Sequence, residues 1–160
     1  MGQSGLLKLH HLERNYTMAV ALLSVGLLGL LTFLLGMNVS RERRSVIVTQ
    51  AEAEADHSSG LRKAIRAHGN CIEYVPMLSL IILAIGLRTP ILLPMWIAAL
   101  MLSAVIARYV HAAGVLMGES IYTPTTLKVI GAAATYVSGT LLSIILIVRA
   151  FSLFSGGAVS

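Results

Sequence analysis

The chain has 160 residues, of which 56% are hydrophobic and 12% are charged, and its formal net charge is +5 at pH 7. Roughly a quarter of the residues of a soluble domain are charged, so this composition excludes an ordinary soluble domain and indicates a membrane protein. The basic residues lie beside apolar runs, which favours contact with a membrane surface and argues against nucleic acid as a partner.

Four apolar segments predict four membrane-spanning helices, at about residues 17–39, 61–87, 90–114 and 125–150. We therefore expect one all-α domain over residues 1–160, an integral membrane four-helix bundle. The first apolar run, Met18–Val39, is too long for the core of a signal peptide, so we expect it to be retained after the tail Met1–Tyr16. A polar loop, Ser40–Gly60, is expected to follow it.

The second segment spans a membrane only if it includes a polar stretch. Its charge-free part, Tyr74–Leu87, covers roughly 21 Å at about 1.5 Å per residue, short of a hydrocarbon core of roughly 30 Å. The helix must therefore extend back through Glu73 and Asn70 towards Arg66. An ionised side chain at the centre of a membrane costs about 2.5–3.5 kcal/mol, so such residues usually indicate a function.

The third and fourth segments carry small residues at every fourth position, which lets helices pack closely in a membrane. The third follows a short link around Arg88, which makes it an antiparallel neighbour of the second. Its row leads to His111, so that His111 is predicted to face a packed neighbour. The two rows are Ala99, Ser103 and Ala107 in the third segment, and Gly131, Thr135, Gly139 and Ser143 in the fourth.

Lysine and arginine residues are concentrated on one side of the predicted spans, which predicts that this side is cytoplasmic. The first loop is therefore expected in the cytoplasm and both termini on the opposite side. This topology brings the polar ends of all four helices to one membrane face. The basic residues on the predicted cytoplasmic side are Arg41, Arg43, Arg44, Arg62, Lys63, Arg66 and Lys128; those opposite are Lys8, Arg14, Arg88 and Arg149.

Arg66, Asn70 and Glu73 lie on one stripe of the second helix at 100° per residue. Arg66 and Glu73 are two turns apart, about 10.5 Å, which suits a small ligand with both a carboxylate and an ammonium group. Arginine binds carboxylates, glutamate accepts from an ammonium, and asparagine does either. An internal network, with Glu73 paired to Arg66 or Arg108 to neutralise buried charge, explains the same residues, and periodicity leaves both open.

The histidines, the cysteine and the carboxylates predict no metal site and no catalytic triad. His68 points away from the stripe, so it faces another helix or another subunit. Cys71, the single cysteine, is expected to be a small apolar residue in a packed helix.

The stripe resembles the signature of the MAPEG proteins (membrane-associated proteins in eicosanoid and glutathione metabolism). The string Ala64–Pro76, with Arg66, Asn70, Glu73 and Tyr74, resembles the bacterial branch especially. Ala107–Gly114 at the end of the third helix gives a second match, and Arg41–Arg43 a weaker third. The resemblance covers nearly the whole chain apart from its N-terminal tail.

The resemblance implies a homotrimer that binds glutathione, as co-substrate, between neighbouring subunits near the cytoplasmic face of a bacterial inner membrane. Arg66 and His68 would meet the glutathione carboxylates from different protomers, and Asn70 and Glu73 would hold the γ-glutamyl end. Tyr74, Arg108 and His111 are expected to line the site. Arg43 occupies roughly the place of a basic residue near the thiol. An interfacial histidine without a ligand remains the alternative for His68.

Two departures from the family pattern concern catalysis. Catalytic relatives have an arginine near the start of the fourth helix, whereas the nearest basic residue in this chain is Lys128. They also have a tyrosine at the position that Val115 occupies here. Lys128 is therefore either a thiolate stabiliser or an interfacial anchor.

Three functions follow from these features. The first is a glutathione transferase or peroxidase acting on lipophilic electrophiles through an activated thiolate. The second is a non-catalytic scaffold of the same fold that binds a lipid or another ligand. The third, a transporter, is disfavoured because the charges lie at one end of the helices and no broken-helix pair is present.

Overall fold

The computed structural model describes the backbone of residues 3–47, 49–87 and 95–156, and the side chains of 16, 18–47, 49–87 and 95–154. In this part of the chain the regular elements are all helices, which confirms the all-α prediction. They are α1 (Gln3–Ser45), α2 (Gln50–Ala55), α3 (Gly60–Leu87), α4 (Met95–Met117) and α5 (Thr126–Gly156).

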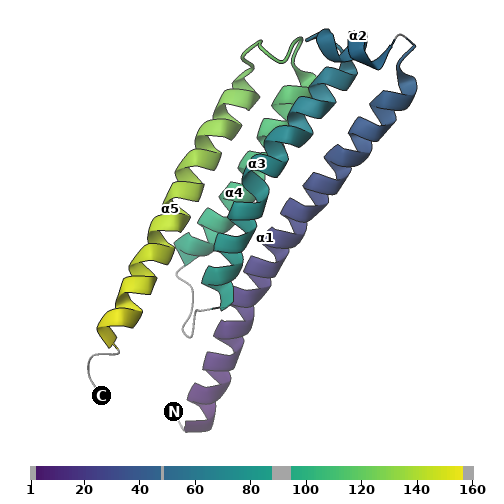
Figure 1. Cartoon of the computed structure of the whole chain (residues 1–160). Helices are drawn as coiled ribbons and strands as arrows, with labels where there is room; N and C mark the ends of the chain where they lie inside the picture. Colours follow the sequence, from purple (N-terminus) through teal and green to yellow (C-terminus); the bar gives the residue numbers. More distant parts are fainter. Residues whose placement is uncertain (1–2, 48, 88–94, 157–160) are drawn as a thin grey trace.

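Four of these helices are long and apolar enough to cross a membrane, and they form the predicted bundle (Figure 1). Helix α3 contains the whole polar stretch, from before Arg66 through Glu73. Its 28 residues give it a length of about 42 Å, whereas its charge-free part is too short to span. The polar half therefore belongs to the spanning helix, as the length argument requires.

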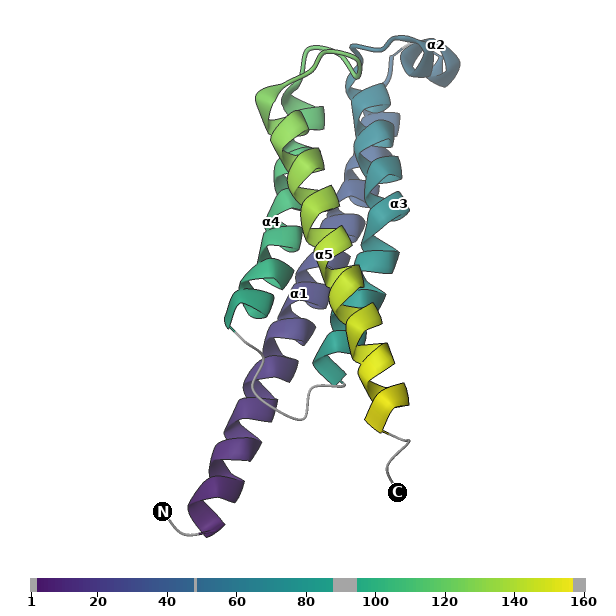
Figure 2. The same ribbon diagram turned by 90° about the vertical axis from the view of Figure 1, so that its left-hand side faces the viewer.

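Helix α1 is longer at both ends than the predicted 17–39. It begins at Gln3 and ends at Ser45, so the expected N-terminal tail is helical from Gln3. Hydrophobicity sets the expected bounds, but helix formation depends on backbone propensity, and neither flanking stretch contains proline. The N-terminal part of α1 extends beyond the ends of the other helices (Figures 1 and 2).

The segment 40–60 is not a simple polar loop, because it contains the last turn of α1 and the short helix α2. Thr49 and Glu52 form a capping box at the start of α2: each side chain accepts a hydrogen bond from the other residue's backbone N–H. The pattern Thr-x-x-Glu was present in the sequence and predicts this helix start.

The helices pack in pairs, with α1 along α3 and α4 along α5, and α4 joins the pairs through contacts with α1 and α3. The shared core is built from large apolar side chains that are fully buried, among them Leu28, Ile82, Met101 and Leu142. Both chain ends lie at one end of the bundle, and α2 and the α4–α5 connection lie at the other (Figures 1 and 2).

Two glycines allow α4 and α5 to approach closely near their connection. A Cβ atom on Gly131 would lie 2.5 Å from the backbone nitrogen of His111, and one on Gly114 would clash with the backbone of Lys128. Gly131, the first residue of the predicted row on α5, therefore packs against α4, whereas Gly139 further along the row lies beside Leu78 of α3. On the α4 row Ala107 and His111 are buried and Ala99 and Ser103 are exposed. The predicted link around Arg88 and the expected helix start at 90 lie outside the described residues.

Candidate functional site

The polar ends of the four long helices meet at the end of the bundle that carries α2 (Figure 1). Arg41 stands near the end of α1, Arg66 near the start of α3, His111 near the end of α4 and Lys128 near the start of α5. The alternating directions of the helices place these residues together, as the sequence predicts. Two grooves at this end and a third that continues along α3 and α5 contain most of the predicted site residues.

The first, which we call the polar groove, has a volume of about 580 Å³ and runs between α3, α4 and α5. That volume is in the range of small-molecule sites. The loop between α4 and α5 forms its outer wall. Its lining residues are Arg66, Asn70, His111, Val115, Ile121, Tyr122, Pro124, Lys128, Val129, Ala132, Ala133 and Tyr136.

Arg66, which lines this groove, forms an ion pair with Glu73, two turns further along α3. A guanidinium nitrogen of Arg66 lies 3.6 Å from a carboxylate oxygen of Glu73, and about half of each side chain is exposed. Glu73 lies thirteen residues after the start of α3, about 20 Å along the helix. Because an exposed carboxylate at that depth is costly in lipid, this surface needs a ligand, a second subunit or water beside it.

Arg108 is buried behind the polar groove and contacts Asn70. Its Nη2 donates to the side-chain oxygen of Asn70 at 2.8 Å and to the backbone oxygen of Asn70 at 3.2 Å. Arg108 is 1% exposed and Asn70 is 8% exposed. The sequence left both Arg66 and Arg108 open as partners of Glu73. In the structure Glu73 pairs with Arg66, and Arg108 binds the Asn70 amide instead.

Tyr74 connects this buried arginine to α5. The Arg108 guanidinium lies 5.2 Å from the centre of the Tyr74 ring, a cation–π distance, and the Tyr74 hydroxyl lies 3.0 Å from the hydroxyl of Tyr136. The two tyrosine hydroxyls form a hydrogen-bonded pair at the inner end of the groove. A small cavity of about 10 Å³ lies among these side chains, next to Arg108 and His111.

His111 and Lys128 are held by backbone groups. The Nδ1 atom of His111 lies 2.9 Å from the carbonyl oxygen of Lys128. The ammonium of Lys128 donates to the carbonyl oxygens of Ile121 and Thr123, each at 2.8 Å. Lys128 therefore fastens the α4–α5 loop over the groove and keeps one of its three N–H donors for another partner.

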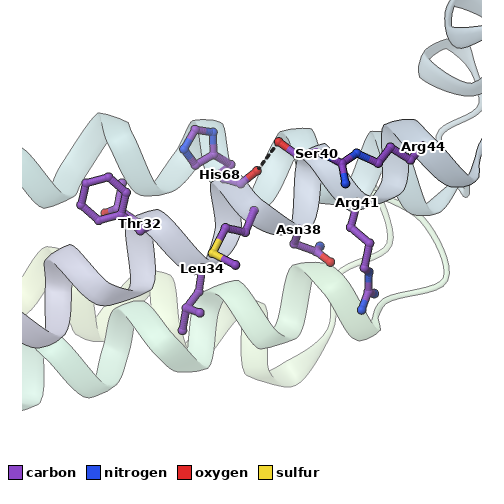
Figure 3. A pocket seen from close by; sticks show the side chains of 10 residues that line it. Thr32, Leu34, Asn38, Ser40, Arg41, Arg44 and His68 are labelled. Atoms are coloured by element: carbon purple, nitrogen blue, oxygen red, sulfur yellow. Dashed lines mark hydrogen bonds between the residues drawn. The ribbon is translucent and has the colours of Figure 1, made fainter.

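The second groove, which we call the α1 groove, lies on the opposite side of α3 and has a volume of about 770 Å³. It contains His68, which thus projects away from Arg66 as the helical periodicity predicts. Figure 3 shows His68 beside α1, with Asn38, Arg41 and Arg44 around the same groove. Arg43 is exposed and is not among the lining residues, which include its neighbours Arg41 and Arg44.

The third groove, which we call the apolar groove, continues along α3 and α5 from Glu73, Tyr74 and Tyr136 and has a volume of about 660 Å³. Its lining is mostly aliphatic, and Gly139 lets the Leu78 side chain approach closely, since a Cβ atom on Gly139 would lie 3.3 Å from it. The lining residues are Glu73, Tyr74, Met77, Leu78, Ile81, Thr135, Tyr136, Gly139, Thr140, Ser143, Ile144 and Ile147.

Sequence reasoning missed Tyr136, which lines the polar groove, the apolar groove and the small cavity between them. A usable signal was present, because a tyrosine in the middle of an apolar span needs a hydrogen-bond partner for its hydroxyl. Arg44 was assigned only to the predicted cytoplasmic side, and Arg41 to that side and to the weaker family match after the first helix. In the described part of the chain, no group of three or more His, Cys, Asp or Glu side chains is arranged to hold a metal ion.

The family model described as MAPEG family matches residues 21–148, which is most of the chain and includes the whole of α3 and α4 and the larger parts of α1 and α5. None of the curated proteins and none of the solved structures matches the chain.

Proposed function

Because the chain belongs to the MAPEG family, we propose that this multi-pass membrane protein is a glutathione transferase or peroxidase that acts on lipophilic electrophiles. Family membership supports a glutathione-related role at a membrane. One observation carries the finer proposal: Arg66 and Asn70 line the polar groove, and Glu73, the ion-pair partner of Arg66, lines the apolar groove of about 660 Å³, which shares Tyr136 with the polar groove.

In this proposal glutathione lies in the polar groove. Its γ-glutamyl end carries a carboxylate and an ammonium group, which match Asn70 and Glu73, and Arg66 binds a carboxylate with its planar guanidinium. Glutathione would replace the Arg66–Glu73 ion pair: a carboxylate of the ligand would pair with Arg66 and its ammonium with Glu73, and both side chains are already accessible. The lipophilic co-substrate would lie in the apolar groove, next to Tyr74 and Tyr136.

We further propose a homotrimer in which the α1 groove of one protomer covers the polar groove of its neighbour. His68 and Arg66 lie on opposite sides of α3, so one small ligand can reach both only between two protomers. The exposed arginines Arg41 and Arg44, with Arg43 beside them, would then supply positive charge from the neighbouring α1. The same arrangement would cover the exposed ion pair.

The chemical step requires a glutathione thiolate. A free thiol has a pKa of about 8.5, and lowering it by about two units requires roughly 2.7 kcal/mol of stabilisation of the thiolate relative to the thiol. A nearby cation in a site without water provides stabilisation of that size. Lys128 is a weaker candidate than a free arginine because two of its three donors bind the loop.

Two measurements on the detergent-solubilised protein test the proposal in sequence. Calorimetry should show that glutathione binds the wild-type protein, and absence of binding would overturn the proposed function. Stopped-flow measurement of ultraviolet thiolate absorbance should then show that the bound thiol ionises at neutral pH.

A non-catalytic scaffold of the same fold is the second candidate, and the engagement of Lys128 by the loop favours it. A scaffold would bind its ligand without forming a thiolate, so the absorbance measurement separates the two functions.

A further inference from the structure

Arg108 is a buried cation without a carboxylate partner in the described part of the chain. The ion pairs found there join Arg41 to Glu42 and Arg66 to Glu73. Instead, Arg108 contacts an amide, a backbone carbonyl and the face of a tyrosine ring, and its Nε atom is buried without a hydrogen-bond partner. A buried charge without an opposite charge is expensive, so a role beyond packing is expected for it.

The chemistry of the guanidinium determines the orientation of the Asn70 amide. A guanidinium has only donors, so the Asn70 atom that it contacts at 2.8 Å must be the oxygen. The second contact, to the backbone oxygen of Asn70, holds the guanidinium in place beside the same residue. Turning the amide over would bring its NH₂ group against the guanidinium, which places two donors against each other.

The fixed orientation of the Asn70 amide affects the polar groove, because Asn70 lines this groove although Arg108 does not. With the amide oxygen held towards Arg108, the two N–H donors of Asn70 remain for a ligand. An asparagine with a free amide can turn either its oxygen or its NH₂ group towards a ligand, whereas the orientation of this amide is fixed. The positive charge of Arg108 behind it adds to the preference for an anionic acceptor.

We propose that Arg108 is a positioning residue that turns the N–H donors of Asn70 to the ligand, so that the polar groove selects a carboxylate at this point, while Glu73, about one turn further along α3, accepts the ammonium. The inference rests on the proposed binding of glutathione and assigns the orientation of its γ-glutamyl end. Arg108 acts on the ligand through Asn70 and needs no contact with the ligand itself.

The test compares two ligands in calorimetry on the solubilised protein. One is glutathione, and the other is its analogue with hydrogen in place of the α-carboxylate of the γ-glutamyl residue. The wild-type protein should prefer glutathione by about tenfold or more, which corresponds to about 1.4 kcal/mol. The ratio of the two affinities reports on Asn70, because general damage to the groove weakens both ligands alike.

The variant Arg108→Gln should reduce this preference at least about fivefold, because the Asn70 amide is then free to turn over. Arg108→Lys, which keeps a charged donor for the oxygen, should retain most of the preference. A purely structural role predicts that both variants weaken the two ligands by the same factor, and that result would overturn the inference.

Asn70→Asp is the second variant, and it keeps the partner of Arg108. The aspartate oxygens accept from the guanidinium, so the fold should be retained, which thermal stability and gel filtration of the solubilised protein will check. The groove then presents an acceptor and a negative charge, so the preference for glutathione should vanish or reverse. An unchanged preference would overturn the inference alone, while failure of the wild type to bind either ligand would overturn the proposed function as well.

Discussion

At the scale of single residues, the same pattern of charged and amide groups serves two purposes that the sequence could not separate. Arg66 and Glu73 form an accessible ion pair, whereas Arg108 and Asn70 form a buried contact one layer behind it. The Arg66–Glu73 pair is accessible to a ligand. The buried contact between Arg108 and Asn70 fixes the orientation of the side chains behind this pair. The structure therefore gives Glu73 an accessible arginine partner and leaves Arg108 with a neutral amide.

Replacing Glu73 by Gln, or Arg66 by Ala, should weaken glutathione binding at least about tenfold, because each change removes one charge that matches the ligand. Calorimetry on the solubilised protein measures the effect. Glu54→Gln, on α2 and outside the residues that line the three grooves, is the matched control and should bind as the wild type does. Wild-type affinity in both site variants would show that glutathione, if bound, lies elsewhere.

Lys128→Met should loosen the α4–α5 loop, because the ammonium no longer holds the carbonyls of Ile121 and Thr123. Amide hydrogen exchange over residues 118–125 should become faster, by about fivefold or more if each hydrogen bond contributes about 1 kcal/mol. Lys128→Arg keeps a charged donor and serves as the control. Loss of thiolate absorbance with unchanged loop exchange would instead assign Lys128 to the thiol.

At the scale of helices, periodicity predicts faces well and lengths less well. The stripe of α3, the opposite direction of His68 and the close packing of α5 all follow from 100° per residue. The bounds of α1 were wrong because an apolar run measures the width of a membrane, whereas the helix continues through polar residues. The start of α2 depends on the capping box of Thr49 and Glu52. The helix itself is too short to show a hydrophobic periodicity.

Gly131→Val should push α4 and α5 apart, because its side chain would meet the backbone of His111. Overpacking of this kind destabilises by about 1–3 kcal/mol, so thermal unfolding in detergent should occur at a lower temperature. Gly29→Ala on α1 is the control, since a Cβ atom there has nothing within 4 Å. Equal stability of the Gly131→Val variant would mean that the two helices do not approach closely.

Helix α2 should be lost in acid. The hydrogen bond with the Thr49 side chain lowers the pKa of Glu52, and the hydrogen bond with the Ser58 hydroxyl lowers the pKa of Asp56. Because the folded-state pKa values lie below the ordinary ones, the stabilisation is present above the ordinary range and disappears as the pH falls through the lowered values. NMR chemical shifts of Ala51 and Ala53 should follow this loss.

The matched pair for this helix is Glu52→Ala and Glu54→Ala at neutral pH. Glu52→Ala removes the capping box and should shift the alanine signals towards coil values, whereas Glu54→Ala should leave them helical. Helical shifts that persist in the Glu52→Ala variant would mean that other contacts hold α2.

At the scale of the whole molecule, the proposed trimer assigns His68 and Arg66 of each site to different protomers. His68→Ala and Arg66→Ala homotrimers should each bind glutathione weakly. Co-expression of the two variants should restore wild-type affinity at about one quarter of the sites, since a random closed ring pairs the two intact residues that often. If both residues served a site within one protomer, mixing would restore nothing.

The sequence by itself determined the class of the protein: four membrane spans, their alternating directions and the polar stripe of Arg66, Asn70 and Glu73. These follow from composition and from helix periodicity, which are local properties of the chain. The tertiary structure decided the partners: Asn70 for Arg108, the loop carbonyls for Lys128, and Tyr136 for Tyr74. Long polar side chains reach several neighbours at similar distances, so only the packing of the helices selects among them.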